Sequence, residues 1–315
     1  MVMHIARFRH DRTLRWGVIE NQSVVPLHGE YPTTRDLIER GEDDRRGAIG
    51  RSAAIPLSAV TLVSPITAPC RILCQGANYR QHMIESGLDP DAKGYNLFFD
   101  KSDCTVNDPN GSVTTPTNVK LLDYEIELGL VFGTTIDAPL KVTRETLADH
   151  VFGFVMANDV TARDVQLSET QWFKGKSYRG FCPFGPYIAI PERDEFAYID
   201  ALSLSLSVNG EVRQRDTTAN LVHKPAPTIA ELSTFSDIVP GDILLTGTPH
   251  GCALSVPSPM VRRIASALLP EKKLWEVFLK RQRNRPYLKV GDLMTATIAS
   301  DDGVINLGQQ NVTIS

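Results

Sequence analysis

Alternating apolar and polar positions recur along the chain and predict many β-strands. From Ile126 onward every second residue of the stretch 122–131 is apolar, which is the period of a strand. Residues 202–208 alternate leucine or valine with serine, and Asn209-Gly210 then gives a strong hairpin signal. Shorter apolar runs predict strands at 71–74 and 149–158. The chain is therefore β-rich, above all in its second half.

The first 65 residues form a predicted small β/α domain, and 66–315 form the main body. Residues 14–27 predict a short hairpin, and 34–40 predict a short helix that starts with a capping residue. Two prolines within five positions make 63–69 an expected extended linker between the two parts.

Three helical segments are expected in the main body. Residues 80–86 predict one or two turns, and a capping box at Thr228-Ile-Ala-Glu231 predicts a helix toward Phe235. The stretch 256–286 has apolar residues at helical spacing and many basic residues, and Pro270 divides it into two predicted helices.

Composition narrows the class of protein. The chain has 315 residues, of which 42% are hydrophobic and 22% charged, as in ordinary globular proteins. A net charge of −4 gives no sign of a nucleic-acid partner. No apolar run approaches the ~18 residues of a membrane span. The five cysteines are odd in number and show no CxxC pair, so we expect reduced thiols in a cytoplasmic protein.

Three carboxylates are candidate metal ligands. Glu125 and Glu127 lie two apart on the predicted strand, so they share one face. If that face is partly enclosed, the two charges repel until a cation lies between them, and glutamate oxygens suit Mg²⁺, Mn²⁺ or Ca²⁺. Asp159 follows a predicted buried strand and is placed as a third oxygen ligand. The alternatives are a solvated strand face and, for Asp159, an N-cap.

A histidine and a glutamate are candidates for acid–base chemistry. His82 and Glu85 are three apart, so they share a helix face, and a carboxylate beside an imidazole makes it a better general base. The alternative is an exposed polar helix face. The segment 173–186 mixes glycine, proline, aromatic residues and lysines, and we expect a loop that packing alone does not explain.

Five sequence blocks, taken in order, resemble the fumarylacetoacetate hydrolase superfamily. The resemblance covers about residues 70–315, and residues 1–65 resemble the short N-terminal segment of many members. The blocks are Cys74-Gln-Gly-Ala-Asn-Tyr-Arg-Gln-His-Met-Ile-Glu85, Asp123-Tyr-Glu-Ile-Glu-Leu-Gly129, Asn158-Asp-Val-Thr-Ala-Arg-Asp164, Gly175-Lys-Ser177 with Cys182-Pro-Phe-Gly-Pro186, and Thr246-Gly-Thr-Pro249.

This resemblance implies a mainly β (α+β) fold, a mixed β-sandwich roll with a small N-terminal domain and a helical insertion at about 256–286, usually as a homodimer. It implies a divalent cation, Mg²⁺ or Mn²⁺ or else Ca²⁺. The implied site residues are the metal ligands Glu125, Glu127 and Asp159, the catalytic residues His82, Glu85 and Lys176, and the substrate-binding residues Tyr79, Gln166, Lys176 and Thr248.

The implied activity is that of a hydrolase acting on carbon–carbon bonds in ketonic substances. We expect it to cleave an anionic 2,4-dioxo acid, similar to an acylpyruvate or fumarylpyruvate, in the catabolism of aromatic compounds. An isomerase, a decarboxylase or a hydratase acting on a related 2-oxo acid is the alternative, and a non-enzymatic binding protein is a further one.

The chain departs from the family pattern near the substrate. Ala77 stands where many relatives acting on small 2-oxo acids have arginine, so we expect a bulkier substrate than oxaloacetate. Arg179 and Gly180 also depart from the common pattern. The extra residues between Gly251 and Lys289 are expected to form one wall or a lid of the pocket, or else a helical pair on the surface or at a dimer contact.

Overall fold

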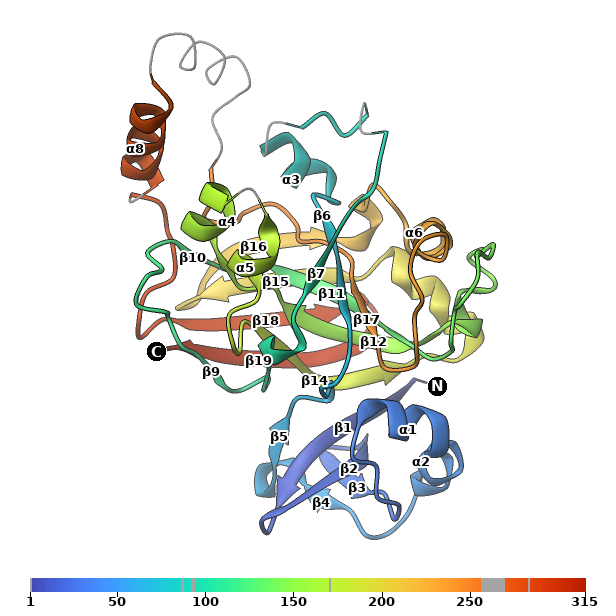
Figure 1. Cartoon of the computed structure of the whole chain (residues 1–315). Coiled ribbons are helices and arrows are strands. Elements are labelled where there is room, and N and C mark those ends of the chain that lie inside the picture. The colour runs from blue at the N-terminus through green and yellow to red at the C-terminus, as the bar shows by residue number, and fades with distance from the viewer. Residues whose placement is uncertain (1, 86–87, 92–93, 170, 256–269, 283) are drawn as a thin grey trace.

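The computed structural model describes the chain except residues 1, 86–87, 92–93, 170, 256–269 and 283 (Figure 1). Its described strands form a large mixed sheet, a five-stranded sheet and one further pair. The large sheet has the order β4 (Ile55–Pro56), β3 (Ser23–Pro26), β2 (Thr13–Glu20), β1 (Met3–His10), β14 (Cys182–Ile190), β12 (Val151–Asn158), β11 (Ile126–Phe132), β17 (Ile243–Leu245), β6 (Ile72–Gly76) and β7 (Leu97–Lys101), with β5 (Thr61–Val63) beside β1 and β8 (Val106–Asn107) beside β14.

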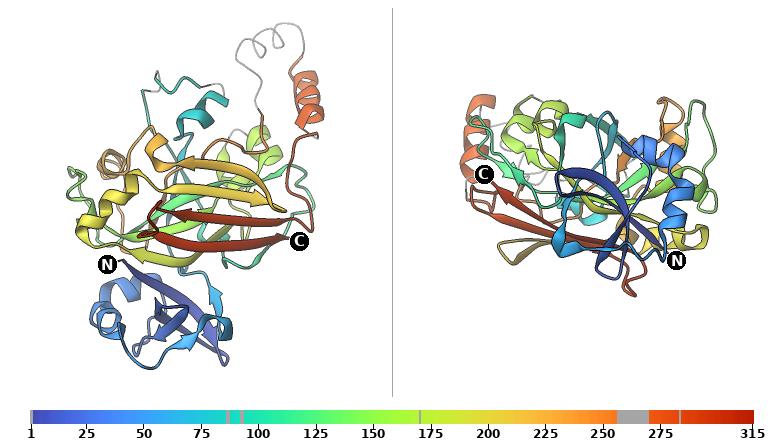
Figure 2. Two further views of the ribbon diagram at one scale, coloured as in Figure 1. Left: turned by 180° about the vertical axis from the view of Figure 1, so that it is seen from behind. Right: turned by 90° about the horizontal axis from the view of Figure 1, so that it is seen from below.

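When the molecule is seen from behind, the gold and red strands of the five-stranded sheet lie above the blue N-terminal strands (Figure 2, left). Its order is β16 (Glu211–Thr217), β15 (Ser203–Val208), β18 (Leu293–Ala299), β19 (Asn306–Ile314) and β9 (Ser112–Val113), and the separate pair is β10 (Leu122–Asp123) with β13 (Thr161–Ala162).

Short helices lie around these sheets. The described α-helices are α1 (Thr34–Arg40), α2 (Glu42–Ala48), α3 (Arg80–Glu85), α4 (Arg163–Glu169), α5 (Trp172–Lys176), α6 (Pro225–Leu232) and α8 (Glu271–Gln282). Single 3₁₀ segments lie at η1 (Leu57–Ala59), η2 (Asp103–Thr105), η3 (Leu147–Asp149), η4 (Arg193–Asp200) and η5 (Thr218–Asn220). Among the described helices, none is long and apolar enough to cross a membrane.

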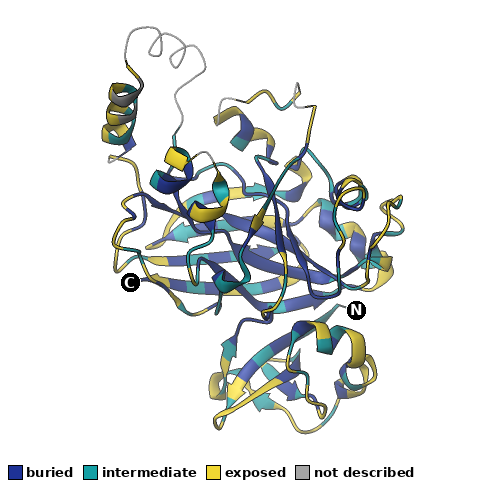
Figure 3. Cartoon of the chain, in the orientation of Figure 1, coloured by how far each residue is buried: buried dark blue, intermediate teal, exposed yellow. Residues whose placement is uncertain are grey.

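The central strands of the large sheet are buried on both faces, as the dark bands in Figure 3 show. On one face, Leu128 and Leu130 of β11 pack in one core cluster with residues of the five-stranded sheet, such as Leu206. On the other face, Val131 packs in a second cluster with residues of the first 65, such as Trp16. All seven residues of β11 are therefore buried. The structure confirms the mainly β sandwich, whereas the division at residue 65 stays a prediction.

Local turn chemistry predicted from the sequence is present. The hairpin of β2 and β3 turns at Asn21 and Gln22, whose φ angles are 47° and 65°. The hairpin of β15 and β16 turns at Asn209-Gly210, again with positive φ. Two consecutive residues with positive φ give the turn whose twist matches paired strands, and asparagine and glycine adopt this region more readily than the glutamine at position 22. Helix α1 spans Thr34–Arg40 as predicted, but its N-cap is Thr33 and not Thr34, which is the first helical residue.

Four local predictions need correction. The stretch 122–131 is two strands, because β10 pairs with β13 while β11 pairs with β12, and Tyr124-Glu125 lies between them. The expected extended linker 63–69 begins inside a strand, because Val63 is the last residue of β5, and its residues 63–67 are buried. The expected loop at 182–186 belongs to β14.

The fourth correction concerns helix α6, which begins at Pro225 and not at Thr228, because proline suits the first helical position.

The basic segment is only partly described. Helix α8 begins directly after Pro270, as predicted, and projects beyond the sheets (Figure 1). Its last residue, Gln282, is buried and donates to the carbonyl of Ser255 at 2.7 Å. The other predicted helix, at 258–269, lies outside the described residues. Its role as a wall, lid or dimer contact stays a prediction.

Candidate metal centre and active site

Three buried carboxylates converge, as predicted from the sequence. Glu125, Glu127 and Asp159 offer ligand oxygens within 4.8 Å of one another, and the residues are only 5%, 2% and 0% exposed. The register of β11 and β12 places Ile126 opposite Asn158, so Asp159 follows beside Glu125. The backbone N–H of Asp159 donates to the Glu125 carbonyl at 2.8 Å, which fixes this approach. The exposed-face alternative is therefore wrong, because all three carboxylates are buried. Glu125 lies between β10 and β11 and not on the strand that carries Glu127, so the three carboxylates converge without a shared strand face, and their role as metal ligands stays a prediction.

Two buried lysines bind these carboxylates. The Lys176 ammonium, at the end of α5, lies 2.6 Å from Glu125 Oε2 and 2.6 Å from Asp159 Oδ2. The Lys101 ammonium, at the end of β7, lies 2.5 Å from Asp159 Oδ1 and 3.1 Å from the Val160 carbonyl. Both ammonium groups therefore belong to the centre itself.

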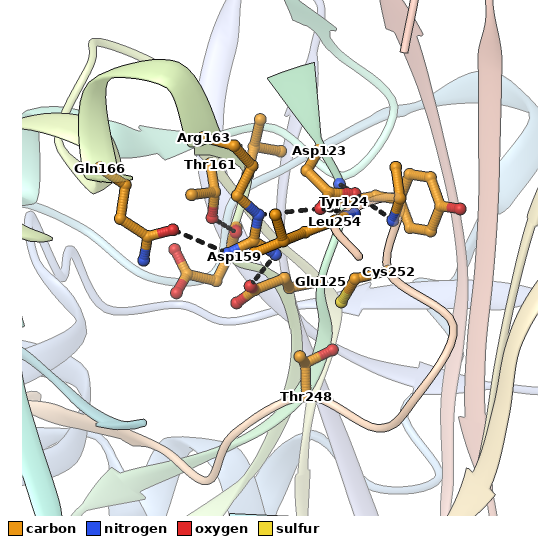
Figure 4. A network of polar contacts seen from close by, with 12 residues as sticks. Asp123, Tyr124, Glu125, Asp159, Thr161, Arg163, Gln166, Thr248, Cys252 and Leu254 are labelled. Carbon is orange, nitrogen blue, oxygen red and sulfur yellow. Dashed lines mark hydrogen bonds and ion pairs between the residues drawn. The ribbon is translucent and has the colours of Figure 1, made fainter. Parts of the chain in front are cut away.

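A buried arginine completes the cationic wall. Arg163, the first residue of α4, binds Asp123 and Glu125 and donates from Nη1 to Gln166 Oε1 at 3.0 Å (Figure 4). Because an arginine stays protonated in proteins, this wall carries a permanent positive charge.

The two glutamates titrate in opposite directions. Burial opposes ionisation of Glu125, but the Lys176 and Arg163 charges outweigh it and lower its pKa to about 2. Burial and the charges of Asp159 and Glu125 raise the pKa of Glu127 well above its ordinary value. Glu127 accepts the N–H of Gly247 at 2.8 Å, and no ion pair among the described residues includes it.

The opposite pKa shifts of Glu125 and Glu127 bear on whether these residues fit a metal ion. Glu127 is a buried carboxylate without a cationic partner among the described residues, beside two carboxylates that already share lysines. A hard divalent cation between the three would supply the missing charge and take oxygen ligands, as Mg²⁺ and Mn²⁺ prefer. The residues present therefore fit a divalent cation.

His82 lies near this centre on α3 and is half-buried. Burial lowers its pKa, opposed by the Glu125 and Glu85 charges and reinforced by those of Arg163 and Lys176. The imidazole is therefore neutral at neutral pH and can accept a proton. No hydrogen bond joins it to Glu85 in the described structure. Instead Glu85 Oε2 accepts the Gly251 N–H at 3.4 Å, so the predicted dyad stays a prediction.

The expected substrate-binding residues lie in different surroundings. Gln166 is buried beside Arg163. Thr248 donates to the carbonyl of Ile126, the first residue of β11, at 3.0 Å. Tyr79 is fully buried in the main core cluster, and its hydroxyl makes no hydrogen bond with the described residues. Burial gives Tyr79 a packing role, and its contact with substrate stays a prediction, as do those of Gln166, Lys176 and Thr248.

Sequence reasoning missed three charged residues of this centre: Asp123, Arg163 and Lys101. Asp123 precedes Glu125 by two positions, so the same period-2 pattern could have included it. Arg163 lies inside the block 158–164, but the pattern of that block alone assigns it no role. Lys101 had no signal of its own beyond its place at the end of an apolar run.

The chain belongs to the fumarylacetoacetate hydrolase family, since residues 71–315 match the family described as "Fumarylacetoacetate (FAA) hydrolase C-terminal". Residues 3–65 match "Rv2993c-like, N-terminal". The family assignment confirms the resemblance drawn from the five sequence blocks.

Particular relatives narrow the comparison. The chain is 36% identical over 244 residues to the mitochondrial oxaloacetate tautomerase Fahd2a of Rattus norvegicus, covering 76% of this chain and 75% of the relative. It is 36% identical over 209 residues to the oxaloacetate tautomerase YisK of Bacillus subtilis, covering 66% of this chain and 68% of that one. The solved structure of a fumarylacetoacetate hydrolase from Exiguobacterium antarcticum superposes with a TM-score of 0.73 at 27% identity, covering 99% of both chains.

These relatives correct the expected activity, because the two curated relatives are tautomerases. The solved structure of a probable 2-hydroxyhepta-2,4-diene-1,7-dioate isomerase from Mycobacterium abscessus is also similar to this chain. It superposes with a TM-score of 0.73 at 27% identity, covering 100% of this chain and 98% of that one. The prediction of a carbon–carbon hydrolase is therefore wrong, and the alternative of an isomerase is better supported. The error has a physical reason, because one set of charged residues can serve several reactions of 2-oxo acids.

Proposed function

We propose that this protein is a metal-dependent tautomerase that interconverts the keto and enol forms of a 2-oxo acid such as oxaloacetate. The observation that carries the proposal is the buried carboxylate triad enclosed by Lys101, Arg163 and Lys176. Enolisation places negative charge on the 2-oxygen of the substrate, and preorganised cations stabilise such a charge strongly in a dry site. The names of the curated relatives support the same reaction class.

The chemistry needs a Lewis acid, a proton acceptor and a fixed positive charge. A divalent cation held by Glu125, Glu127 and Asp159 would supply the Lewis acid beside the 2-oxo group. His82, neutral because burial lowers its pKa, takes a proton from C3 of the substrate. The electron pair of that C–H bond forms the C2–C3 double bond, and the carbonyl pair moves onto the 2-oxygen. The protonated His82 then gives that proton to the 2-oxygen, which completes the enol. In the reverse direction the 2-oxygen loses its proton to His82, the C2–C3 double bond takes it up at C3, and the oxygen pair restores the carbonyl.

Two features favour proton transfer over hydrolysis. Tautomerisation requires only one group that exchanges a proton with carbon, and His82 suffices for this. Hydrolysis also requires an activated water, and Glu85, which would orient His82 for that task, instead contacts the backbone of Gly251. Because the reaction conserves atoms, no water enters the products.

Other parts of the proposal come from the family resemblance. The cation is Mg²⁺ or Mn²⁺, the protein is a homodimer, and the substrate is a small anion. The cytoplasmic compartment stays a prediction, and the name of the rat relative places that protein in mitochondria. The preference for a substrate bulkier than oxaloacetate, drawn from Ala77, stays a prediction too.

The test follows the ultraviolet absorbance of enol-oxaloacetate after it is added to the metal-loaded protein. We expect faster loss of the enol than in buffer with the same Mn²⁺, and return to the buffer rate after exhaustive chelation. A panel of longer 2-oxo dicarboxylic acids, assayed in parallel, tests the Ala77 prediction. An enzyme that leaves the enol rate unchanged with metal bound, yet cleaves acylpyruvates, would overturn the proposal.

A further inference from the structure

Asp123 is a fully buried carboxylate that holds two distant segments together. Its Oδ1 accepts the backbone N–H groups of Tyr124 at 3.0 Å and Ala253 at 2.8 Å. Its Oδ2 accepts the N–H of Leu254 at 3.1 Å and Nε of Arg163 at 2.8 Å (Figure 4). One side chain therefore joins the end of β10, just before Glu125, to the segment 253–254 and to the start of α4.

The arginine that Asp123 holds extends this contact to the centre. The Arg163 guanidinium binds Oε1 of Glu125, whereas Oε2 of Glu125 accepts from Lys176, whose ammonium also binds Asp159. Arg163 thus holds one oxygen of Glu125 and leaves the other on the side of Lys176. A ligand fixed in this way loses less conformational entropy when a cation binds.

Arg163 also sets the orientation of Gln166. Because Gln166 Oε1 accepts from Arg163 Nη1, its amide NH₂ group is turned away from Arg163 and remains a donor for a second partner. In the proposed reaction that partner is the anionic substrate. Asp123 therefore orients Arg163, and Arg163 in turn orients Glu125 and Gln166.

Charge balance explains why an acid is needed at position 123. Arg163 is buried, and a buried guanidinium must be paired with negative charge. Without a carboxylate at position 123, Arg163 would pair with Glu125 alone among the described residues and would compete with a cation for that carboxylate. Because Asp123 also pairs with Arg163, the arginine has a carboxylate partner apart from the three candidate metal ligands.

We propose that Asp123 is a positioning residue that acts through Arg163 to prepare Glu125 for the metal and Gln166 for the substrate, and that it also holds the segment 253–254 against the centre. The metal arm of this proposal rests on the structure alone. The substrate arm rests on the proposed function.

The first test is Asp123→Asn, which keeps one acceptor for backbone N–H groups and removes the charge. We expect Mn²⁺ affinity, measured by calorimetry, to fall by about 10–100-fold, the usual cost of losing a partner of a metal ligand. We also expect KM for the substrate to rise. Because Cys252 is buried next to Ala253, its thiol should react faster with a maleimide, as measured by peptide mass spectrometry.

A matched control separates positioning from general stability. Asp242 is also buried and also accepts two backbone N–H groups, from Arg71 at 2.8 Å and Val239 at 3.0 Å. It precedes β17, whose Ile243 pairs with Val131 near the far end of β11 from the carboxylates. Asp242→Asn should lower stability and leave Mn²⁺ affinity and Cys252 reactivity unchanged.

A second variant keeps the test decisive if Asp123→Asn does not fold. Arg163→Lys leaves the bonds of Asp123 to 253–254 but cannot reach three acceptors at once. It should weaken Mn²⁺ binding while Cys252 stays protected. Unchanged Mn²⁺ affinity in a folded Asp123→Asn or Arg163→Lys protein would overturn the proposal. If metal binding weakens as expected but the wild type does not accelerate enol loss, the positioning role stands and the proposed function fails.

Discussion

The two ends of β11 are both buried, but charged side chains surround one end and apolar side chains surround the other. At one end, Glu127 and the adjoining Glu125 lie among buried lysines and an arginine. At the other end, Val131 and Phe132 lie among apolar side chains, and Ile243 of β17 pairs with Val131. Burial of charge costs free energy unless each charge is matched, whereas burial of apolar groups stabilises directly.

The comparison teaches that the centre is prepared for a ligand and the other end is not. The apolar end is complete with the residues it has. The charged end leaves Glu127 without an ion-pair partner among the described residues, and burial together with the charges of Asp159 and Glu125 raises its pKa. A site that is incomplete without a divalent cation gains stability when the cation binds.

Removal of Glu127 should weaken metal binding at the charged end of β11 more than any other change considered. In Glu127→Ala one of three ligands is lost, so Mn²⁺ affinity should fall by more than the ~10–100-fold cost of losing an outer partner. Tautomerase activity should fall with it. Calorimetry and the enol assay measure both effects. Full activity of this variant after removal of loosely bound metal would show that Glu127 is not a ligand.

Removal of a buried cation should damage folding more than chemistry. In Lys101→Met, Asp159 loses the ammonium at 2.5 Å but keeps that of Lys176 at 2.6 Å, so the loss of stability should stay below the ~3–5 kcal/mol of a buried charge left with no partner. Urea unfolding without metal should show this loss, and added Mn²⁺ should restore part of it because the cation replaces the charge. A variant as stable as the wild type without metal would mean that Lys101 is not needed for charge balance.

Loss of the proposed base should affect rate and leave metal binding intact. His82→Ala should reduce kcat/KM by ~10²-fold or more, the usual scale for general-base catalysis. Since burial lowers the pKa of His82, the wild-type rate should hold at neutral pH and fall as acid protonates the imidazole at a pH below 6.5.

The pH dependence has its own control. Metal occupancy is measured at each pH, so that ligand protonation is not mistaken for titration of His82. The acidic limb should be absent from the residual activity of His82→Ala. An identical limb in that variant would assign it to another group.

A conservative change at the apolar end should have the smallest effect. Ile243→Val removes one buried methyl group and should cost about 0.5–1.5 kcal/mol of stability. Mn²⁺ affinity and kcat/KM should stay at wild-type values, because Ile243 belongs to the apolar end. A large change in metal affinity would show that the two ends are coupled.

Much of this arrangement could be predicted from sequence because it follows short-range patterns. Period-2 spacing predicted that Glu125 and Glu127 lie close together, which they do although Glu125 precedes β11, and a strand end predicted Asp159 nearby. The partners Lys101 and Arg163 come from separate segments, and only the pairing of β6 with β7 and the start of α4 bring them in. No local pattern encodes those contacts.

The reaction class could not be read from the same residues. A histidine near a carboxylate triad can serve either proton transfer to carbon or activation of water. The resemblance of the sequence blocks led us to expect hydrolysis, but the residues themselves do not distinguish the two reactions. The position of the Glu85 side chain, which faces Gly251, depends on a contact between segments far apart in the chain.

Because of the register of β11 and β12, the proposed cation can bind only after these two strands have paired in their native alignment. Ile126 must stand opposite Asn158 before Asp159 can reach Glu125, and a slip of one residue would turn every side chain of the strand to the other face. A nascent chain with misaligned strands therefore has no site to fill. Uptake of Mn²⁺ during refolding would thus report the moment at which these two strands reach their native alignment.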